Sequence, residues 1–264
     1  MLRYLFLIFI VFIFPSAYAA KIALVIGNSA YDKSLSPLQF SDLPNSVNDA
    51  IDVAAELRKL GFKVILKTNV GKKAMMAAVR DFSRRLGNKR GAIGLFFFSG
   101  HGIQHNNLNY LIPLKADIQT SIDVDDEAFK ADYVLRYLKK YNNRGVNIII
   151  LDACRNSIPE NVFKKRESMG FDGISQGLTN MNAPTGGLIA YATAPNKVSW
   201  AGLPGERNSV YTKHLLIALR QKANTSISNL FMQVRRNVMA ETKNEPVQQV
   251  PWELSSLLRT PEKS

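Results

Sequence analysis

The chain has 264 residues and a single cysteine, so it can bury the core of one full domain but cannot form an internal disulfide. Lysine and arginine number 34 against 21 acidic residues, and the net charge of +13 favours attraction to anionic surfaces or acidic partners. The basic residues are scattered and lack the aromatic and basic strand motif of single-strand binders, so we expect a solvated basic surface and no nucleic-acid partner.

The amino-terminal segment has the pattern of a secretory signal peptide. A positive start at Arg3 is followed by an uninterrupted apolar stretch, residues 4–14, and then by small residues at Ala17 and Ala19. The pattern predicts removal of residues 1–19 and export to the periplasm or the cell exterior. The apolar stretch is short for a bilayer span, so an uncleaved anchor is the less favoured alternative, and only that alternative gives a membrane partner.

Beyond this segment, buried strands alternate with amphipathic helices. Continuous apolar runs predict strands at residues 21–27, 62–66, 92–98, 146–151 and 187–193. Apolar residues at helical spacing predict helices at residues 46–60, 73–86, 132–141, 209–221 and 226–241. A hairpin-like stretch is expected at residues 108–114, and residues 247–258 close the domain. This alternation implies right-handed crossovers and a largely parallel sheet covered by helices on both faces.

Two stretches are expected to lack regular structure. Residues 28–44 are rich in Ser, Asn, Asp and Pro, and Ser46 behind them fits the N-cap of the first helix, with an acid at Asp49. Residues 155–185 contain Pro, Gly, Asn and Ser together with a basic triplet. We predict a mobile loop there.

The cysteine follows the end of a predicted strand. The apolar run of residues 146–151 stops at Asp152, and Cys154 comes two residues later. Another buried run, residues 92–98, is followed by His101 in the sequence Ser-Gly-His-Gly. Because chemistry collects at the carboxyl ends of parallel strands, neighbouring strands would bring this thiol and imidazole together. Cys154 would then be a nucleophile and His101 its general base, the alternative being a buried structural cysteine.

The remaining histidines fit this chemistry less well. His105 lies in a polar turn and is interpreted as a loop residue, whereas His214 sits among leucines on a predicted helix and is interpreted as structural. His101 is flanked by Gly100 and Gly102, which allow close backbone approach to a substrate.

These residues resemble the caspase and metacaspase clan of cysteine peptidases. His101 precedes Cys154, the cysteine of the sequence Asp-Ala-Cys-Arg-Asn, by 154 − 101 = 53 residues, as in a clan whose histidine lies about 50 residues upstream of its cysteine. Residues 189–195 with Ser199 and Trp200 resemble the strand that opens a caspase small subunit, and residues 249–253 resemble the last strand of bacterial members. The resemblance runs from about residue 21 to residue 259.

The resemblance implies a three-layer α/β/α sandwich with a mostly parallel six-stranded sheet. It divides the chain into a large-subunit-like half at residues 20–158, an inter-half loop at 159–185 and a small-subunit-like half at 186–264. Together these parts form one compact catalytic domain, residues 20–260.

The resemblance also assigns roles at the site. The backbone N–H groups of Gly102 and Cys154 would form the oxyanion hole. The backbone around Ala192 and Ser199 is expected to contact the substrate. Trp200 is interpreted as a pocket wall, with core packing as the alternative.

Asp152 and Asp49 decide the expected specificity. Caspases carry Gln at the position of Asp152 and hold a substrate aspartate with arginines. Residues 22–57, where one of these arginines is expected, contain none, and Ala201 stands where caspases have a second arginine. Metacaspases place Asp at both positions, and two carboxylates complement a guanidinium or ammonium. We therefore predict cleavage after Arg or Lys. The alternatives are helix-start capping for Asp49 and a structural role for Asp152.

The basic triplet Lys164, Lys165 and Arg166 lies in the predicted inter-half loop. A peptidase specific for basic residues could cut itself there, and a solvated linker is the alternative.

The acidic cluster around Asp123, Asp125 and Asp126 is a weak calcium candidate, because metacaspases are often activated by calcium. Its spacing is not that of an EF-hand and lacks the EF-hand glycine. No cofactor is expected to be required for the reaction.

A competing motif, Gly-Ile-Ser-Gln-Gly at residues 173–177, fits the serine-hydrolase elbow. That elbow needs a strand before it and a helix after it, and neither is predicted here. The sequence thus predicts an exported cysteine endopeptidase whose peptide or protein substrates carry a basic residue before the cut. The alternative is a catalytically silent interaction or regulatory domain of the same fold, and both a monomer and a homodimer stay open.

Overall fold

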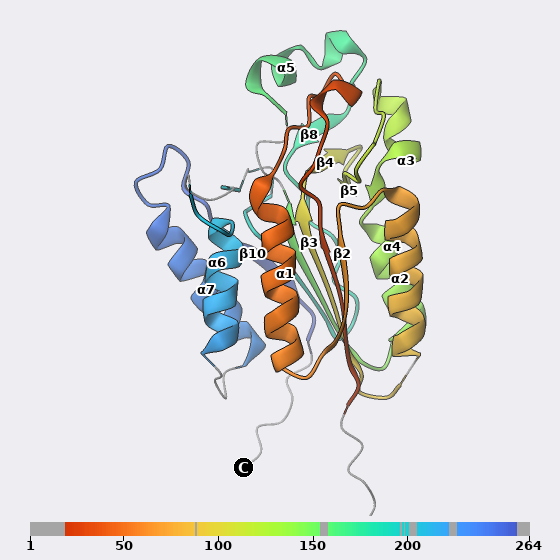
Figure 1. Ribbon diagram of the computed structural model, residues 1–264, viewed down its shortest axis with the longest axis vertical. Helices are drawn as coiled ribbons and strands as arrows, with labels where there is room; N and C mark the ends of the chain where they lie inside the picture. The colour runs from red at the N-terminus through yellow and green to blue at the C-terminus, as the bar shows by residue number, and fades with distance from the viewer. Residues whose placement is uncertain are drawn as a thin grey trace, which may run out of the picture.

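The computed structural model describes residues 19–87, 89–153, 158–195, 197, 199–200, 205–221 and 226–257. Six strands form a central sheet in the order β10-β9-β7-β3-β1-β2 (Figure 1). They are β1 (Lys21–Gly27), β2 (Lys63–Thr68), β3 (Ile93–Gly100), β7 (Val146–Ala153), β9 (Gly187–Tyr191) and β10 (Trp252–Ser255). The first five are parallel, and β10 alone pairs antiparallel, at the edge next to β9. The predicted six-stranded, mostly parallel sheet is confirmed.

Helices cover both faces of this sheet, as Figure 1 shows. One face carries α1 (Pro44–Lys59), α6 (Val210–Arg220) and α7 (Ile227–Glu241), and the other carries α2 (Lys72–Leu86) and α4 (Asp132–Tyr141). The alternation of side chains along each strand explains the two layers: Ala23 and Val25 pack towards α1, whereas Leu24 packs towards α2. Within the described residues, no helix is both long enough and apolar enough to cross a membrane.

A second, four-stranded sheet lies beyond the carboxyl ends of the central strands, with the order β6-β5-β4-β8 (Figure 1). Its strands are β4 (Gly102–His105), β5 (Leu108–Leu111), β6 (Phe129–Lys130) and β8 (Ile174–Gln176). The turn between β4 and β5 places Asn106 and Asn107 at φ values of 48° and 61°, the left-handed conformation of a two-residue hairpin turn. The hairpin expected at residues 108–114 therefore begins earlier and uses residues 102–105 as its first strand.

Short helices complete the fold around this second sheet. They are η1 (Lys33–Leu35), η2 (Ser121–Asp123), α3 (Val124–Glu127), α5 (Glu160–Lys165) and η3 (Glu167–Met169). The prediction of an irregular loop at residues 155–185 is wrong for residues 160–165, 167–169 and 174–176, which form α5, η3 and β8. The reason is packing: Val162, Phe171 and Ile174 are buried in an apolar cluster that this segment shares with residues 31–43 and with β4 and β5.

The competing serine motif also has a clear position. Ser175 lies in the middle of β8, which pairs with β4, and no helix follows at residues 178–184. A nucleophile elbow requires a sharp turn between strand and helix. The interpretation of this motif as a coincidence is confirmed.

The first helix starts two residues before its predicted cap. Pro44 occupies its first turn, Leu43 is the N-cap without a side-chain bond, and Ser46 is buried inside the helix. Proline suits this position because its fixed φ is helical and its missing N–H is not needed there. The N-cap assignment of Ser46 is therefore wrong.

Candidate active site

His101 and Cys154 follow the ends of two neighbouring strands in the sequence. β3 and β7 pair in parallel, with Ser99 opposite Asp152 and Gly100 opposite Ala153. Paired strands are about 4.8 Å apart. In the sequence, His101 follows the last residue of β3 and Cys154 follows the last residue of β7. Cys154 itself lies outside the described residues. The register places Gly100 and Ala153, the residues immediately before His101 and Cys154, side by side at the carboxyl edge of the sheet.

His101 is buried and held from several directions. Its backbone N–H donates to the Tyr31 hydroxyl at 3.1 Å, and that hydroxyl donates to the Ile112 carbonyl at 2.9 Å. The Tyr31 ring meets the imidazole edge-on at 4.5 Å between centroids, and the Phe40 ring lies at 5.4 Å. The imidazole Nε2 donates to the Ser41 carbonyl at 2.6 Å, because a carbonyl can only accept. In the neutral imidazole this bond makes Nδ1 the basic nitrogen.

The two glycines beside His101 are required by packing. A Cβ on Gly100 would lie 2.6 Å from the Tyr31 hydroxyl, the group that holds His101. A Cβ on Gly102 would lie 3.1 Å from the Cβ of Ala153 and 3.2 Å from Leu178. The start of β4 therefore packs closely against Ala153, the residue that precedes Cys154.

The two aspartates predicted to set specificity meet at one serine. Asp152, at the end of β7, accepts hydrogen bonds from the hydroxyls of Ser209 and Thr212, the latter at 2.8 Å. Asp49, on α1, accepts from the backbone N–H of Ser209 at 3.0 Å and from the Ser99 hydroxyl at 2.9 Å. Both aspartates are fully buried.

These contacts have an electrostatic consequence. Hydroxyl and amide donors are neutral, so they stabilise a carboxylate without cancelling its charge. Burial, together with the charge of Asp152, raises the pKa of the neighbouring Tyr211 far above its ordinary value. Asp49 lies beyond the first turn of α1 and bonds to other elements, so the helix-start capping alternative for it is excluded.

The segment that carries Ser209 is itself fixed by ion pairs. Arg207 forms a bidentate pair with Asp52 at 2.8 and 2.9 Å. Glu206 contacts Lys213 at 2.6 Å, and Lys213 also contacts Glu241 at 2.6 Å. Residues 205–209 are thereby joined to both α1 and α7.

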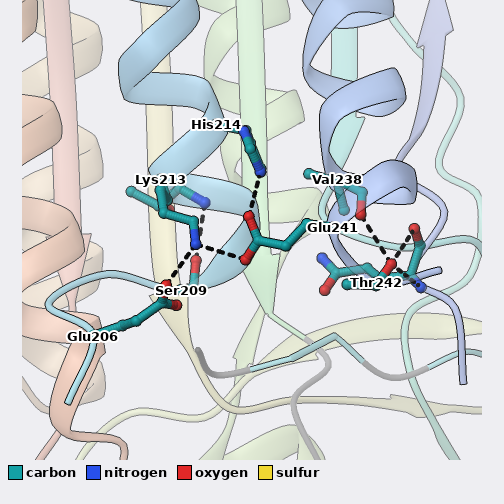
Figure 2. A network of polar contacts seen from close by, with 9 residues as sticks. Glu206, Ser209, Lys213, His214, Val238, Glu241 and Thr242 are labelled. Atoms are coloured by element: carbon teal, nitrogen blue, oxygen red, sulfur yellow. Dashed lines mark hydrogen bonds and ion pairs between the residues drawn. The ribbon is translucent and has the colours of Figure 1, made fainter. Parts of the chain in front are cut away.

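Figure 2 shows how this network of polar contacts continues between α6 and α7. The Nε2 of His214 bonds to the second oxygen of Glu241 at 2.7 Å, so His214 links α6 to α7 and takes no part in the site. The structural interpretation of His214 is confirmed.

The substrate-contact residues implied by the resemblance are joined by Gln249, whose bridging role the sequence does not indicate. The buried side chain of Gln249 donates to the Ala192 carbonyl at 2.7 Å and accepts from the Trp200 backbone N–H at 2.9 Å. The Trp200 ring N–H donates to the Val247 carbonyl at 2.8 Å, and Ser199 is buried. Ala201 lies outside the described residues. An isolated glutamine gives no sequence signal for such a bridge, and Tyr31 and Ser209 were missed for the same reason.

His105 lies away from this edge. It ends β4, three residues from Gly102, and pairs with Leu108 and Ile174. Its interpretation as a loop residue is wrong, because the turn begins only at Asn106. Burial lowers its pKa below the ordinary value, a shift that the Asp125 charge opposes and the Lys130 charge reinforces.

The basic triplet lies at the end of α5. Lys164 and Lys165 are exposed, and Lys164 pairs with Glu160 at 2.7 Å. Arg166 is anchored instead: its Nε donates to the Ile174 carbonyl at 2.9 Å, and its guanidinium lies over the Phe163 ring. The two lysines are therefore more accessible to a peptidase than the arginine.

The acidic cluster is engaged by the protein. Asp123 accepts from the backbone and hydroxyl of Thr120 in a capping box, which lowers its pKa. Asp125 bonds to the Tyr110 hydroxyl and to Lys130, and the backbone carbonyls of Asp125 and Asp126 accept from a lysine. Among the residues that the structure describes, no three acidic, histidine or cysteine side chains are arranged to hold a metal ion.

Comparison with known proteins agrees with this geometry. The chain is 26% identical over 135 residues to the "Mucosa-associated lymphoid tissue lymphoma translocation protein 1 homolog" of Mus musculus and to the corresponding protein of Homo sapiens. The matched part is 51% of this chain and 15% of each relative, so the chain spans only a small part of their length. The model of the caspase domain matches residues 20–261, nearly the whole chain. The chain therefore belongs to the caspase-domain family of peptidases.

Proposed function

We propose that the protein is a cysteine endopeptidase that uses Cys154 and His101. The observation that carries the proposal is the register of β3 and β7, in which Gly100 and Ala153 are partners immediately before the two residues. The family membership agrees with this chemistry.

In the proposed reaction, Nδ1 of His101 takes the thiol proton, and the thiolate of Cys154 attacks the scissile carbonyl. The Ser41 carbonyl stabilises the imidazolium, since it accepts from Nε2. The backbone N–H groups of Gly102 and Cys154 would bind the oxyanion. The imidazolium then protonates the leaving amine, and water releases the acyl group from sulfur.

We propose specificity for Arg or Lys before the cut. Its support is the pair of buried carboxylates, Asp49 and Asp152, which meet at the same edge of the sheet and are bonded by neutral donors. A guanidinium or ammonium group is the side-chain chemistry that a pair of carboxylates complements.

Further parts of the proposal come from the sequence. Residues 1–19 direct export to the periplasm or the cell exterior, and no cofactor takes part in the reaction, with calcium kept as an optional activator. Self-cleavage would occur at Lys164 or Lys165, both exposed, in preference to the anchored Arg166.

The decisive experiment is covalent labelling of the purified chain with an electrophilic peptide that ends in arginine. We expect mass spectrometry to place the label on Cys154, with labelling lost in Cys154→Ala and strongly reduced in His101→Ala. A matched probe that ends in aspartate should label far more slowly, and parallel reactions with calcium or chelator test activation. A folded chain that no arginine or aspartate probe labels would be a silent interaction domain instead.

A further inference from the structure

A concave site lies on the α2/α4 side of the molecule, apart from the proposed catalytic residues. This cleft has a volume of about 280 Å³ and is lined by residues of α2, α3, β6 and α4. Its floor is apolar, with Met76 from α2, Phe129 from β6 and Ala128 immediately before β6. A volume of this order accommodates one or two side chains of a ligand.

The rim of the cleft is basic. Lys72, Lys130 and Arg136 line it together with a single carboxylate, Asp125, so three positive charges face one negative charge. Lys130 pairs with Asp125 at 3.2 Å, and Lys72 donates to two backbone carbonyls, which leave its charge uncancelled. Arg136 is exposed and lies over the Tyr133 ring at 5.6 Å. The rim therefore attracts an anionic group, and a planar guanidinium suits a carboxylate.

The aromatic residues beside the cleft favour a peptide over a nucleic acid. Tyr133, Tyr137 and Tyr141 follow one another along α4 with centroids 4.7 and 5.8 Å apart. Arg136 covers Tyr133, and the Lys140 ammonium lies 5.5 Å from the Tyr141 centroid. Tyr133 and Tyr141 thus each contact a cation, and Tyr137 lies between these two rings, whereas binding of single strands uses ring faces on which bases can stack. The recessed apolar floor also differs from the protruding apolar side chains that enter a membrane.

We propose that this cleft binds an acidic peptide segment, with an apolar side chain on the floor and carboxylates against Arg136 and the rim lysines. This binding does not depend on the proposed peptidase activity, because no residue of the proposed catalytic edge lines the cleft.

The test uses the full chain carrying Cys154→Ala, so that no peptide is cut, and a fluorescein-labelled peptide of alternating glutamates and leucines. We expect saturable binding in fluorescence anisotropy and slower backbone hydrogen exchange at residues 125–137. Arg136→Gln should weaken binding about fivefold, and Lys130→Gln together with Arg136→Gln about tenfold or more. Lys139→Gln removes an equal charge from an exposed position on the same helix and should change binding less than about twofold.

Three results would overturn the proposal. One is an equal loss of binding in Arg136→Gln and Lys139→Gln, which would show attraction by net charge alone. Another is equal binding of the peptide after its glutamates are replaced by glutamine. The third is tighter binding of a single-stranded oligonucleotide of matched charge that depends on Arg136. Because hydrogen exchange is measured on the chain with its cleft unaltered, failure of a variant to fold does not affect that measurement.

Discussion

Ser209 donates its hydroxyl hydrogen bond to the carboxylate of Asp152, and the same hydroxyl accepts from the Thr212 backbone N–H at 2.9 Å. One serine therefore caps α6 and holds a carboxylate of the proposed specificity site. Its backbone N–H holds the other, Asp49. Changes at this residue should affect folding and substrate recognition together.

Replacement of Ser209 by alanine should destabilise the protein by about 2–3 kcal/mol, because it removes a helix cap and a buried bond to a charged group. Urea unfolding of Cys154→Ala chains measures this change. Ser226 provides the matched control, since it caps α7 at an exposed site, and Ser226→Ala should cost about 1 kcal/mol. Equal costs at the two serines would contradict a bond between Ser209 and Asp152.

If the proposed specificity holds, removal of either carboxylate, Asp49 or Asp152, should reduce hydrolysis of arginine substrates. We expect Asp49→Asn or Asp152→Asn to lower kcat/KM about tenfold or more, because a hydrogen bond to a charged group contributes about 1.5–3 kcal/mol. The measurement is hydrolysis of a fluorogenic peptide with arginine before the cut. Asp81→Asn is the control, as it removes a carboxylate that pairs with Arg85 on α2 and should keep activity within about threefold. Unchanged activity in both site variants would refute basic specificity.

The Tyr31 hydroxyl should matter for catalysis through the position of His101. Tyr31→Phe removes the bridge between the His101 backbone and the Ile112 carbonyl. We expect a stability loss of about 1–2 kcal/mol and a severalfold lower kcat with little change in KM. Tyr133→Phe, which removes a partly exposed bond to Tyr137, should leave kcat unchanged. An unaltered kcat in Tyr31→Phe would show that other contacts alone hold His101.

The lowered pKa of His105 should appear in the pH dependence of stability. As pH falls through about 6.5, the unfolded chain binds a proton that the folded chain accepts only at lower pH. His105 therefore supports folding above this range, and that contribution is lost as the pH falls below it. Between about pH 7.5 and pH 5, the urea midpoint should fall more in the parent chain than in His105→Gln. Parallel curves for the two chains would contradict a lowered pKa.

The strands of the central sheet could be predicted because the signal is local and strong. Residues 146–151 are apolar except for Asn147, and the structure buries this run on both faces as part of β7. The helix at Asp132–Tyr141 was predicted with its observed bounds. These elements need only the period of their own apolar residues.

Other features depend on residues that are distant in the sequence. The bonds of Ser209 to Asp152 and Asp49 join positions 57 and 160 residues apart, and no local pattern encodes them. The start of α1 was misplaced because Ser46 is a good cap locally, yet Pro44 fits the first turn as well. The helix α5 was missed because a six-residue helix depends on packing rather than on periodicity.

The parts of the chain before and after residues 159–185 contact each other through the central sheet and its helices, and these contacts do not depend on the peptide bonds of the segment between them. β9, from the second half, adds in parallel to β7 from the first, and α6 packs beside α1. A break after Lys165 would leave every one of these contacts in place. A molecule cut after Lys165 should therefore migrate as a single particle in gel filtration and separate into two fragments only in denaturant. Self-cleavage at this position would then release the cut ends of a surface segment while the two fragments stay associated.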